Sequence, residues 1–277
     1  MGSHIMNTVG KKLPINLCTS YHNISKQIGS MFLNQGSSRG SSSNEQFVPL
    51  SCYPLDCKDI YDNGKTSDGV YWIYPSGHYS DAVPVYCDMT SSNGPWTVFQ
   101  KRFDGSEDFY RGWEDYKVGF GRADSEYWLG LENIYRLTLQ KAYRLRIDLT
   151  DFDNDSRFVI YNNFSLSPLS ISGVAESYKL YIVGFEEGDP SKAIGDSFRS
   201  QHTMGFTTYD HDVDVDSRNC ASTYKGGSWY RNCHSANLNG LYLGGNTNQY
   251  ATGMTWESWR GFYYSMKTTE MKIAVNF

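Results

Sequence analysis

Residues 209–240 read YDHDVDVDSRNCASTYKGGSWYRNCHSANLNG and show almost no helical or strand-like period. A segment of this length without regular structure inside a compact domain is usually either a functional loop or a disordered one. Three aromatic residues supply apolar surface, and a bond between Cys220 and Cys233 would close the segment. We therefore predict an ordered, cross-linked loop that presents polar groups for binding.

An acidic run opens this stretch. Aspartates stand at four alternate positions: Asp210, Asp212, Asp214 and Asp216. A hard cation such as Ca²⁺ takes roughly six to eight oxygen ligands, so the run is typical of either a calcium loop or a solvated acidic turn. An EF-hand is excluded, because Val215 stands where that motif needs Gly and Ala221 where it needs Glu. A calcium site of another kind remains the functional interpretation.

The two cysteines of this stretch admit a structural and a catalytic interpretation. A disulfide between Cys220 and Cys233 would stabilise the fold by about 3 kcal/mol through loop-closure entropy. The alternative is a nucleophile pair of Cys233 and His234, but a disulfide-bonded sulfur is not a nucleophile. No Cys-x-x-Cys spacing indicates zinc. The disulfide is the favoured interpretation.

The sequence shows no catalytic constellation. It lacks His-Glu-x-x-His and a phosphate-cradling glycine loop. His78 and His202 have no partner evident in the sequence, so we expect surface or structural roles for them. We therefore predict that the protein is not an enzyme.

Composition excludes several classes of partner. The chain has 277 residues and a formal net charge of −5, which gives no electrostatic footprint for nucleic acid or anionic lipid. No apolar run approaches the roughly 18 residues of a membrane span, so no membrane insertion is expected. Residues 1–6, MGSHIM, are typical of an expression scar and are excluded from the fold.

Residues 7–51 are predicted to be a tail and linker. Residues 34–45 are rich in Gly and Ser, a composition typical of a flexible linker. The chain has six cysteines, which favours an oxidising compartment, and we expect a secreted protein. N-x-S/T sequons give three candidate glycosylation sites: Asn23, Asn154 and Asn163.

The chain from Cys52 onward is long enough, at about 225 residues, to bury a sizeable core. Residues 125–139 are the best helix, because Ser125 can cap it and the apolar side chains have near-helical spacing. Strand-like runs are found at residues 70–75, 84–89, 96–103, 143–152, 157–166, 177–185 and 271–277.

Several specific motifs resemble one known family. Residues 210–221, DHDVDVDSRNCA, and 229–240, WYRNCHSANLNG, are similar to the C-terminal half of a fibrinogen-related domain. The upstream runs DGVYWIYP, VYCDM, WTVFQKRFDGSEDFYRGWEDYKVGFG and EYWLGLENIYRLT resemble the same family. The resemblance covers about residues 55–277 and is strongest to ficolins, tachylectins and related acetyl-group receptors.

The resemblance implies an α+β fold with a mainly antiparallel central sheet, a few short helices and a loop-rich subdomain that binds calcium and ligand. It places the fibrinogen-related domain at residues 52–277. An N-terminal subdomain would span residues 52–97, a binding subdomain residues 191–265, and a central sheet subdomain residues 98–190 together with 266–277. The last strand would thus return to the central sheet.

The resemblance also implies two disulfides, Cys57–Cys87 and Cys220–Cys233. Cys18 and Cys52 are then left over on either side of the linker. They either pair with each other or join protomers, since leftover cysteines in a secreted protein raise the interchain option. We therefore expect a homo-oligomer, formed through Cys18 or Cys52.

The calcium site implied by the resemblance takes carboxylates from Asp212 and Asp214 and main-chain carbonyls from Asp216 and Arg218. The side chains of Asp210 and Asp216 are then expected to add only local negative potential. Ca²⁺ is the expected cofactor.

An acetyl-binding pocket is also implied, formed by Tyr224, Cys233, His234, Tyr250, Ala251 and Phe262. Phe262 keeps an apolar wall but lacks a hydrogen-bonding group. The Asn232–Cys233 bond matches one that is cis in acetyl-binding relatives, where it aims the amides of Cys233 and His234 at one acceptor. A cis bond without proline costs about 3–4 kcal/mol.

Two function classes follow from this resemblance. The first is a calcium-dependent, lectin-like pattern-recognition module of innate immunity that binds N-acetylated glycans such as N-acetylglucosamine. The second is a protein-binding module of the angiopoietin or tenascin kind, which engages a receptor or matrix partner. His234 favours the first, because receptor-binding relatives tend to lose this histidine.

Overall fold

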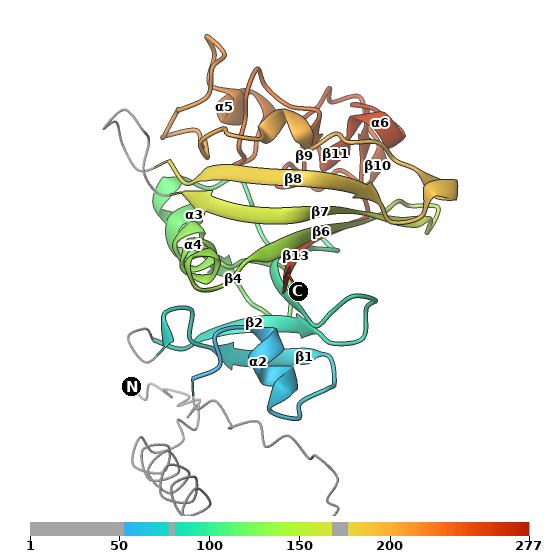
Figure 1. Cartoon of the computed structure of the whole chain (residues 1–277). Helices are drawn as coiled ribbons and strands as arrows, with labels where there is room; N and C mark the ends of the chain where they lie inside the picture. Colours follow the sequence, from blue (N-terminus) through green and yellow to red (C-terminus); the bar gives the residue numbers. More distant parts are fainter. Residues whose placement is uncertain (1–52, 78–80, 168–176, 277) are drawn as a thin grey trace, which may run out of the picture. The chain divides into compact units, whose positions relative to one another are not determined.

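The computed structural model describes residues 53–77, 81–167 and 177–276. An antiparallel sheet lies at its centre (Figure 1). The sheet runs in the order β1 (Gly69–Ile73), β2 (Val83–Asp88), β3 (Trp96–Arg102), β13 (Thr268–Val275), β6 (Tyr143–Thr150), β7 (Ser156–Ser167) and β8 (Lys179–Glu187). Two short strands, β4 (Phe120–Gly121) and β5 (Tyr127–Trp128), pair beside β3. With few and short helices, the structure confirms the predicted α+β class.

The last strand lies inside the sheet. Glu270 of β13 is paired with Lys101 of β3 on one side and with Asp148 of β6 on the other. Buried Lys272 of β13 forms ion pairs with Asp88 of β2 and Asp148 at 2.7 and 2.8 Å. Three surrounding carboxylates raise the pKa of this lysine despite its burial, so it stays charged and bridges β13 to β2 and β6.

The first two strands belong to this same sheet. β2 is paired with β3 at Cys87 and Thr97, and the predicted subdomain boundary between residues 97 and 98 falls within β3. The Cys57–Cys87 disulfide joins α2 (Cys57–Asp62) to β2, with 5.5 Å between the two Cα atoms.

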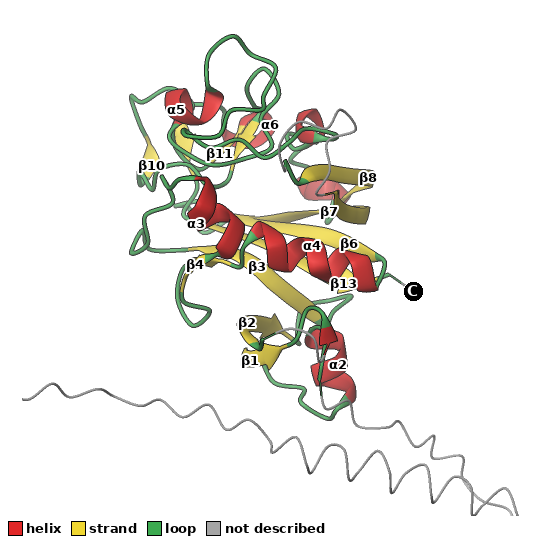
Figure 2. Ribbon diagram, turned by 90° about the vertical axis from the view of Figure 1, so that its left-hand side faces the viewer, coloured by secondary structure: helices red, strands yellow, loops and turns green. Residues whose placement is uncertain are grey.

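Two further helices cover one face of the sheet, α3 (Trp113–Val118) and α4 (Leu131–Gln140), as Figure 2 shows. The helix predicted at residues 125–139 begins later, at Leu131, so the proposed Ser125 cap is wrong. Glu126 accepts hydrogen bonds from four main-chain amides of residues 103–107, and Trp128 pairs with Gln100 of β3. These long-range bonds hold residues 126–128 extended, against their local helical pattern.

The chain between β8 and β13 has little regular structure and forms the loop-rich region drawn in orange and red in Figure 1. It contains α5 (Cys220–Tyr224), α6 (Glu257–Arg260) and the 3₁₀ turns η2 (Pro190–Lys192) and η3 (Arg199–Gln201). Two small sheets complete it, formed by β9 (Ala236–Asn237) with β11 (Thr255–Trp256) and by β10 (Gly245–Asn246) with β12 (Tyr264–Ser265). Buried Trp229 packs against Trp128 of β5, with 6.1 Å between their ring centroids, which anchors the region in the main core.

Candidate functional site

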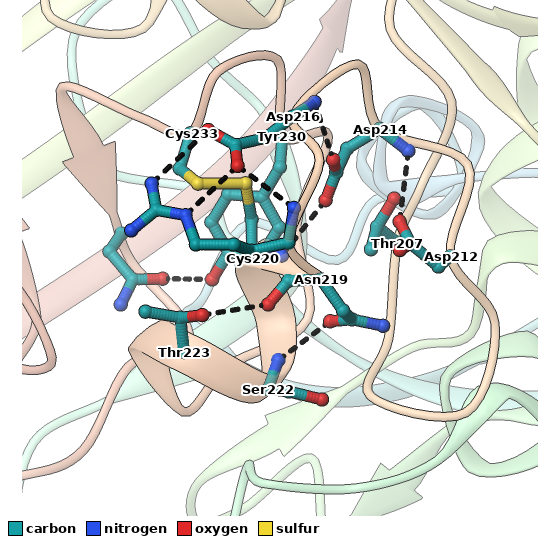
Figure 3. The surroundings of a disulfide bond; sticks show 12 residues. Thr207, Asp212, Asp214, Asp216, Asn219, Cys220, Ser222, Thr223, Tyr230 and Cys233 are labelled. Carbon is teal, nitrogen blue, oxygen red and sulfur yellow. Dashed lines mark hydrogen bonds and ion pairs between the residues drawn. A yellow bond between two sulfur atoms is a disulfide. The ribbon is translucent and has the colours of Figure 1, made fainter.

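The Cys220–Cys233 disulfide and helix α5 hold the centre of the loop-rich region (Figure 3). Asn219 caps the helix, because its Oδ1 accepts the Ser222 amide at 2.7 Å. The Asn219 Nδ2 donates to the Thr208 carbonyl at 3.0 Å, so the same side chain fixes the start of the acidic run. The loop is therefore ordered by its own polar groups and by the disulfide.

Asp214, a carboxylate of the acidic run, accepts two main-chain amides. Its Oδ2 accepts the Cys220 amide and its Oδ1 accepts the Asp216 amide, both at 2.9 Å (Figure 3). Burial, with a smaller contribution from the nearby Asp212 carboxylate, raises the pKa of Asp214 to about 6. The Asp212 and Asp214 carboxylates lie close together, and a cation bound between them would stabilise both in their charged form.

The four predicted metal-binding positions lie together and offer oxygen donors. Asp216 is paired through its side chain with Arg218 at 3.0 Å, which lowers the pKa of Asp216. Within the described ranges no amide donates to the main-chain carbonyls of Asp216 and Arg218. With the carboxylates of Asp212 and Asp214, this donor set fits a hard cation such as Ca²⁺.

A different cluster brings Asp216 within 4.8 Å of the sulfurs of Cys220 and Cys233. Both sulfurs are bonded to each other, so neither is a thiolate available to a metal. This cluster is consequently not a second metal site.

Asp210 has a structural role that the sequence interpretation missed. Its Oδ1 accepts the Trp113 amide at 2.9 Å, at the first turn of α3, and His211 stacks on the Trp113 ring at 3.9 Å. The expectation that Asp210 adds only negative potential is therefore wrong. These contacts attach the acidic run to the helix that covers the central sheet.

The residues of the predicted ligand pocket come together around His234. The His234 ring lies 4.8 Å from Tyr224 and 5.9 Å from Phe262, and Phe262 lies 5.2 Å from Tyr250, measured between ring centroids. Buried Ala251 donates its amide to the Phe262 carbonyl at 2.9 Å. These rings form an aromatic cluster around the His234 imidazole.

His234 is chemically unusual in this setting. Neither Nδ1 nor Nε2 has a hydrogen-bond partner of good geometry among the described residues, although both atoms are buried. Burial lowers the pKa of His234 to about 4, against a smaller raising effect of the Ala251 backbone. The ring is therefore neutral at physiological pH and has unused hydrogen-bonding capacity.

The expected cis bond between Asn232 and Cys233 is wrong. The cis peptide bond found in the described part of the chain is Gly94–Pro95, and Asn232–Cys233 is trans. A hydrogen bond from the Arg231 amide to the Cys233 carbonyl, 2.8 Å long, closes a tight turn with trans geometry. The amides of Cys233 and His234 nevertheless donate to no group of the described residues.

Asn237, which lies in β9, is a site residue that sequence reasoning missed. Its Oδ1 accepts the Tyr230 hydroxyl at 2.7 Å, and its Nδ2 donates to the carbonyls of Tyr224 and Ala251 at 3.0 and 3.4 Å. This fully buried amide thus ties together both sides of the pocket. The SANLNG run places this asparagine next to the predicted site in the sequence. Its three partners come close to it only in the folded chain, so no local signal identifies its role.

The structure describes some of the remaining predicted sites and not others. Asn154 and Asn163 are exposed, as glycosylation would require. Cys18, Asn23, Cys52 and His78 lie outside the described residues.

Known proteins similar to this chain fall into one family. Residues 53–276 match the family model of the C-terminal globular domain of fibrinogen beta and gamma chains. Microfibril-associated glycoprotein 4 of Bos taurus is 56% identical over 220 residues, which are 79% of this chain and 84% of that protein. Fibrinogen C domain-containing protein 1 of Xenopus tropicalis is 48% identical over 79% of this chain and 47% of its own length.

Solved structures agree with the sequence comparisons. The fibrinogen-like globe domain of human ANGPTL2 is 39% identical with a TM-score of 0.75, covering 81% of this chain and all of that one. Lamprey fibrin D-dimer, solved with the peptide ligand Gly-His-Arg-Pro-amide, is 30% identical with a TM-score of 0.71, covering 92% of this chain and 83% of that one.

Proposed function

The chain belongs to the family of fibrinogen C-terminal globular domains, and on that basis we propose that it is a non-catalytic, secreted binding module for a protein partner of the extracellular matrix. Both disulfides of the globular unit support an oxidising environment. Among the described residues no helix is sufficiently long and apolar to span a bilayer.

One observation carries the choice of a protein partner. Tyr250 and Tyr263 are 49% and 56% exposed, and their rings lie 5.3 Å apart at the edge of the His234 pocket. Aromatic side chains are enriched at the centres of protein interfaces, where they bury large area at a low entropic cost. An exposed tyrosine pair beside the aromatic cluster around His234 is the surface such an interface needs.

Relatives support the same choice. One is named for its association with microfibrils, and the lamprey fibrin fragment holds a short peptide. For this chain, immobilised microfibrils are therefore the probe of choice. We expect saturable binding in the presence of calcium. Absence of binding, with retained affinity for N-acetylglucosamine, would instead support the second candidate below.

That second candidate is recognition of an acetyl group, with an acetylated glycan as the partner. It is favoured by the unpartnered nitrogens of His234 and the free amides of Cys233 and His234, which lie beside an apolar wall. An acetamido group offers a methyl for such a wall and a carbonyl oxygen for the donors. The donors remain available although the Asn232–Cys233 bond is trans.

Discrimination between N-acetylglucosamine and glucosamine tests the acetyl candidate. The free amine would bring a charge into the apolar pocket and leave buried donors unpaired, at about 1–3 kcal/mol each. The acetylated sugar should therefore bind at least about tenfold more tightly, and His234→Phe, which removes the imidazole but keeps both main-chain amides, should reduce this difference. Equal affinities of the wild-type chain for the two sugars would eliminate the acetyl pocket.

A further inference from the structure

A cavity of about 700 Å³, lined by none of the residues predicted for calcium or acetyl binding, lies against β8 at the edge of the central sheet. The chain that follows β8 turns back along this strand and is fastened to it at two places. Glu187 accepts the amides of Ile194 and Gly195 at 3.0 and 2.8 Å. At the other end, the Leu180 amide donates to the Met204 carbonyl at 3.0 Å. Between the two attachments the returning segment stands off from the strand, and the cavity fills this space.

One wall of the cavity is apolar and the mouth is basic. Ile182, Val183 and Phe185 of β8 line the wall. Arg199 and Arg231 also line the cavity and are exposed. Neither guanidinium has a hydrogen bond or ion pair with another described residue, so both retain their full donor capacity. An arginine fork of this kind matches the oxygens of a carboxylate or a sulfate.

Two further donors line the same cavity. The Nδ1 of His202 accepts the Ile182 amide at 3.1 Å, so a neutral ring carries its proton on Nε2 and can donate there. The hydroxyl oxygen of Ser200 is buried and has no partner among the residues that the structure describes. A buried hydroxyl without a partner in a native protein calls for an explanation, and an occupant of the cavity would provide one.

The carboxylate that lines the cavity, Asp196, already accepts hydrogen bonds from the protein itself. The Asp196 carboxylate accepts the Tyr161 hydroxyl and, at 3.0 Å, the Arg199 amide. It therefore orients the segment that carries Arg199. Two positive side chains face the cavity against this single negative one, which leaves the mouth attractive to an anion.

We propose that this cavity binds a small organic oxyanion, a carboxylate or sulfate attached to an apolar or ring-shaped body. The oxyanion contacts Arg199, Arg231 and His202, and the body lies against the apolar wall. A bare inorganic ion is too small for a space of about 700 Å³ and would leave the wall unused. The site is also joined to the acidic run, because Arg231 accepts the Val215 amide at 3.1 Å through its main-chain carbonyl.

Binding of defined probes to the full chain tests the proposal. Phenyl sulfate and benzoate are the two anionic probes, benzyl alcohol is the neutral one, and inorganic sulfate lacks the ring. We expect saturable binding of at least one anionic probe by calorimetry or NMR titration. Whichever anionic probe binds more tightly shows whether the site prefers a sulfate or a carboxylate. Benzyl alcohol and inorganic sulfate should each bind at least about tenfold more weakly.

Charge-removing variants locate the site. Arg199→Gln and Arg231→Gln should each weaken the preferred probe at least about fivefold, since hydrogen bonds to charged groups contribute more than neutral ones. Arg122→Gln is the matched control, because Arg122 is exposed, pairs with Asp124 on the turn between β4 and β5, and does not line the cavity. Equal binding of benzyl alcohol, equal binding of inorganic sulfate, or the same loss in Arg122→Gln would each overturn the proposal.

Discussion

At the scale of single residues, His234 combines burial with unused hydrogen-bonding capacity, and this has a consequence for stability. Its pKa of about 4 in the folded chain lies below the roughly 6.5 of an unfolded chain. The unfolded state therefore binds more protons between these values. The stabilising contribution of the neutral ring is complete above pH 6.5 and is lost as the pH falls towards 4.

A comparison with His234→Phe isolates this effect from the titration of carboxylates. The free energy of unfolding of the wild type, minus that of the variant, should decrease between pH 6.5 and 4 by up to about 1.4 kcal/mol per pH unit. Denaturant titrations at several pH values measure the difference. A difference independent of pH would show that His234 titrates normally in the folded protein.

The sequence alone predicted most residues of the candidate site, but not the contacts that hold them in place. The positions predicted for calcium are neighbours in the sequence, and Tyr224 meets His234 beside the Cys220–Cys233 disulfide. Tyr250 and Phe262 reach this cluster only through the fold. Asp210 was misjudged, since its partner Trp113 is 97 positions away. The trans Asn232–Cys233 bond is the isomer that residue type favours, because cis bonds without proline are rare, and the cis expectation came only from the resemblance.

At the scale of secondary-structure elements, strands were easier to predict than the start of α4. Strands such as β6 alternate buried and less buried residues along a continuous run, which local pattern reveals. Residues 126–128 also have a helical pattern, but tertiary bonds to β3 and to the loop at residues 103–107 outweigh it. Such long-range competition has no local signal in a single sequence.

The role of Glu126 in that loop gives a stability prediction. Its carboxylate accepts four main-chain amides and lies 3.9 Å from buried Arg102. Glu126→Ala should lower the free energy of unfolding by about 3 kcal/mol or more, because it leaves the amides and a buried cation without their acceptor. Glu114→Ala, at an exposed position of α3, is the control and should cost well under about 1 kcal/mol. Equal losses in chemical denaturation would refute this role of Glu126.

The acidic run gives a second prediction at this scale. If Ca²⁺ binds the folded loop and not the unfolded chain, mass action raises the melting temperature. Addition of calcium to chelated protein should therefore raise the melting temperature of the wild type, and Asp212→Ala should remove most of that increase. Asp153→Ala removes a comparably exposed carboxylate elsewhere and should leave the increase intact. A wild-type melting temperature that does not respond to calcium would mean that this loop holds no calcium.

At the scale of the whole molecule, we propose that assembly depends on Cys18 and Cys52, which lie outside the described residues. A single shallow pocket binds weakly, and several linked domains gain avidity without new contacts. We expect Cys18 or Cys52 to join protomers, so that a non-reducing gel shows dimers or larger species. The double variant Cys18→Ser/Cys52→Ser should run as a monomer. A wild-type chain that is monomeric without reductant would contradict covalent assembly.

The central claim for the whole molecule is that the aromatic surface around the His234 pocket is the contact surface of a binding module. The most direct measurement compares the affinity for immobilised microfibrils of the wild type, Tyr250→Ala, Tyr263→Ala and Tyr61→Ala in calcium. Tyr61 is the matched control, because it is 40% exposed and lies on α2, outside the loop-rich region. We predict a loss of at least about tenfold, equivalent to ~1.4 kcal/mol, for each pocket variant and less than about twofold for Tyr61→Ala. Unchanged affinity of both pocket variants, or an equal loss in Tyr61→Ala, would contradict the claim.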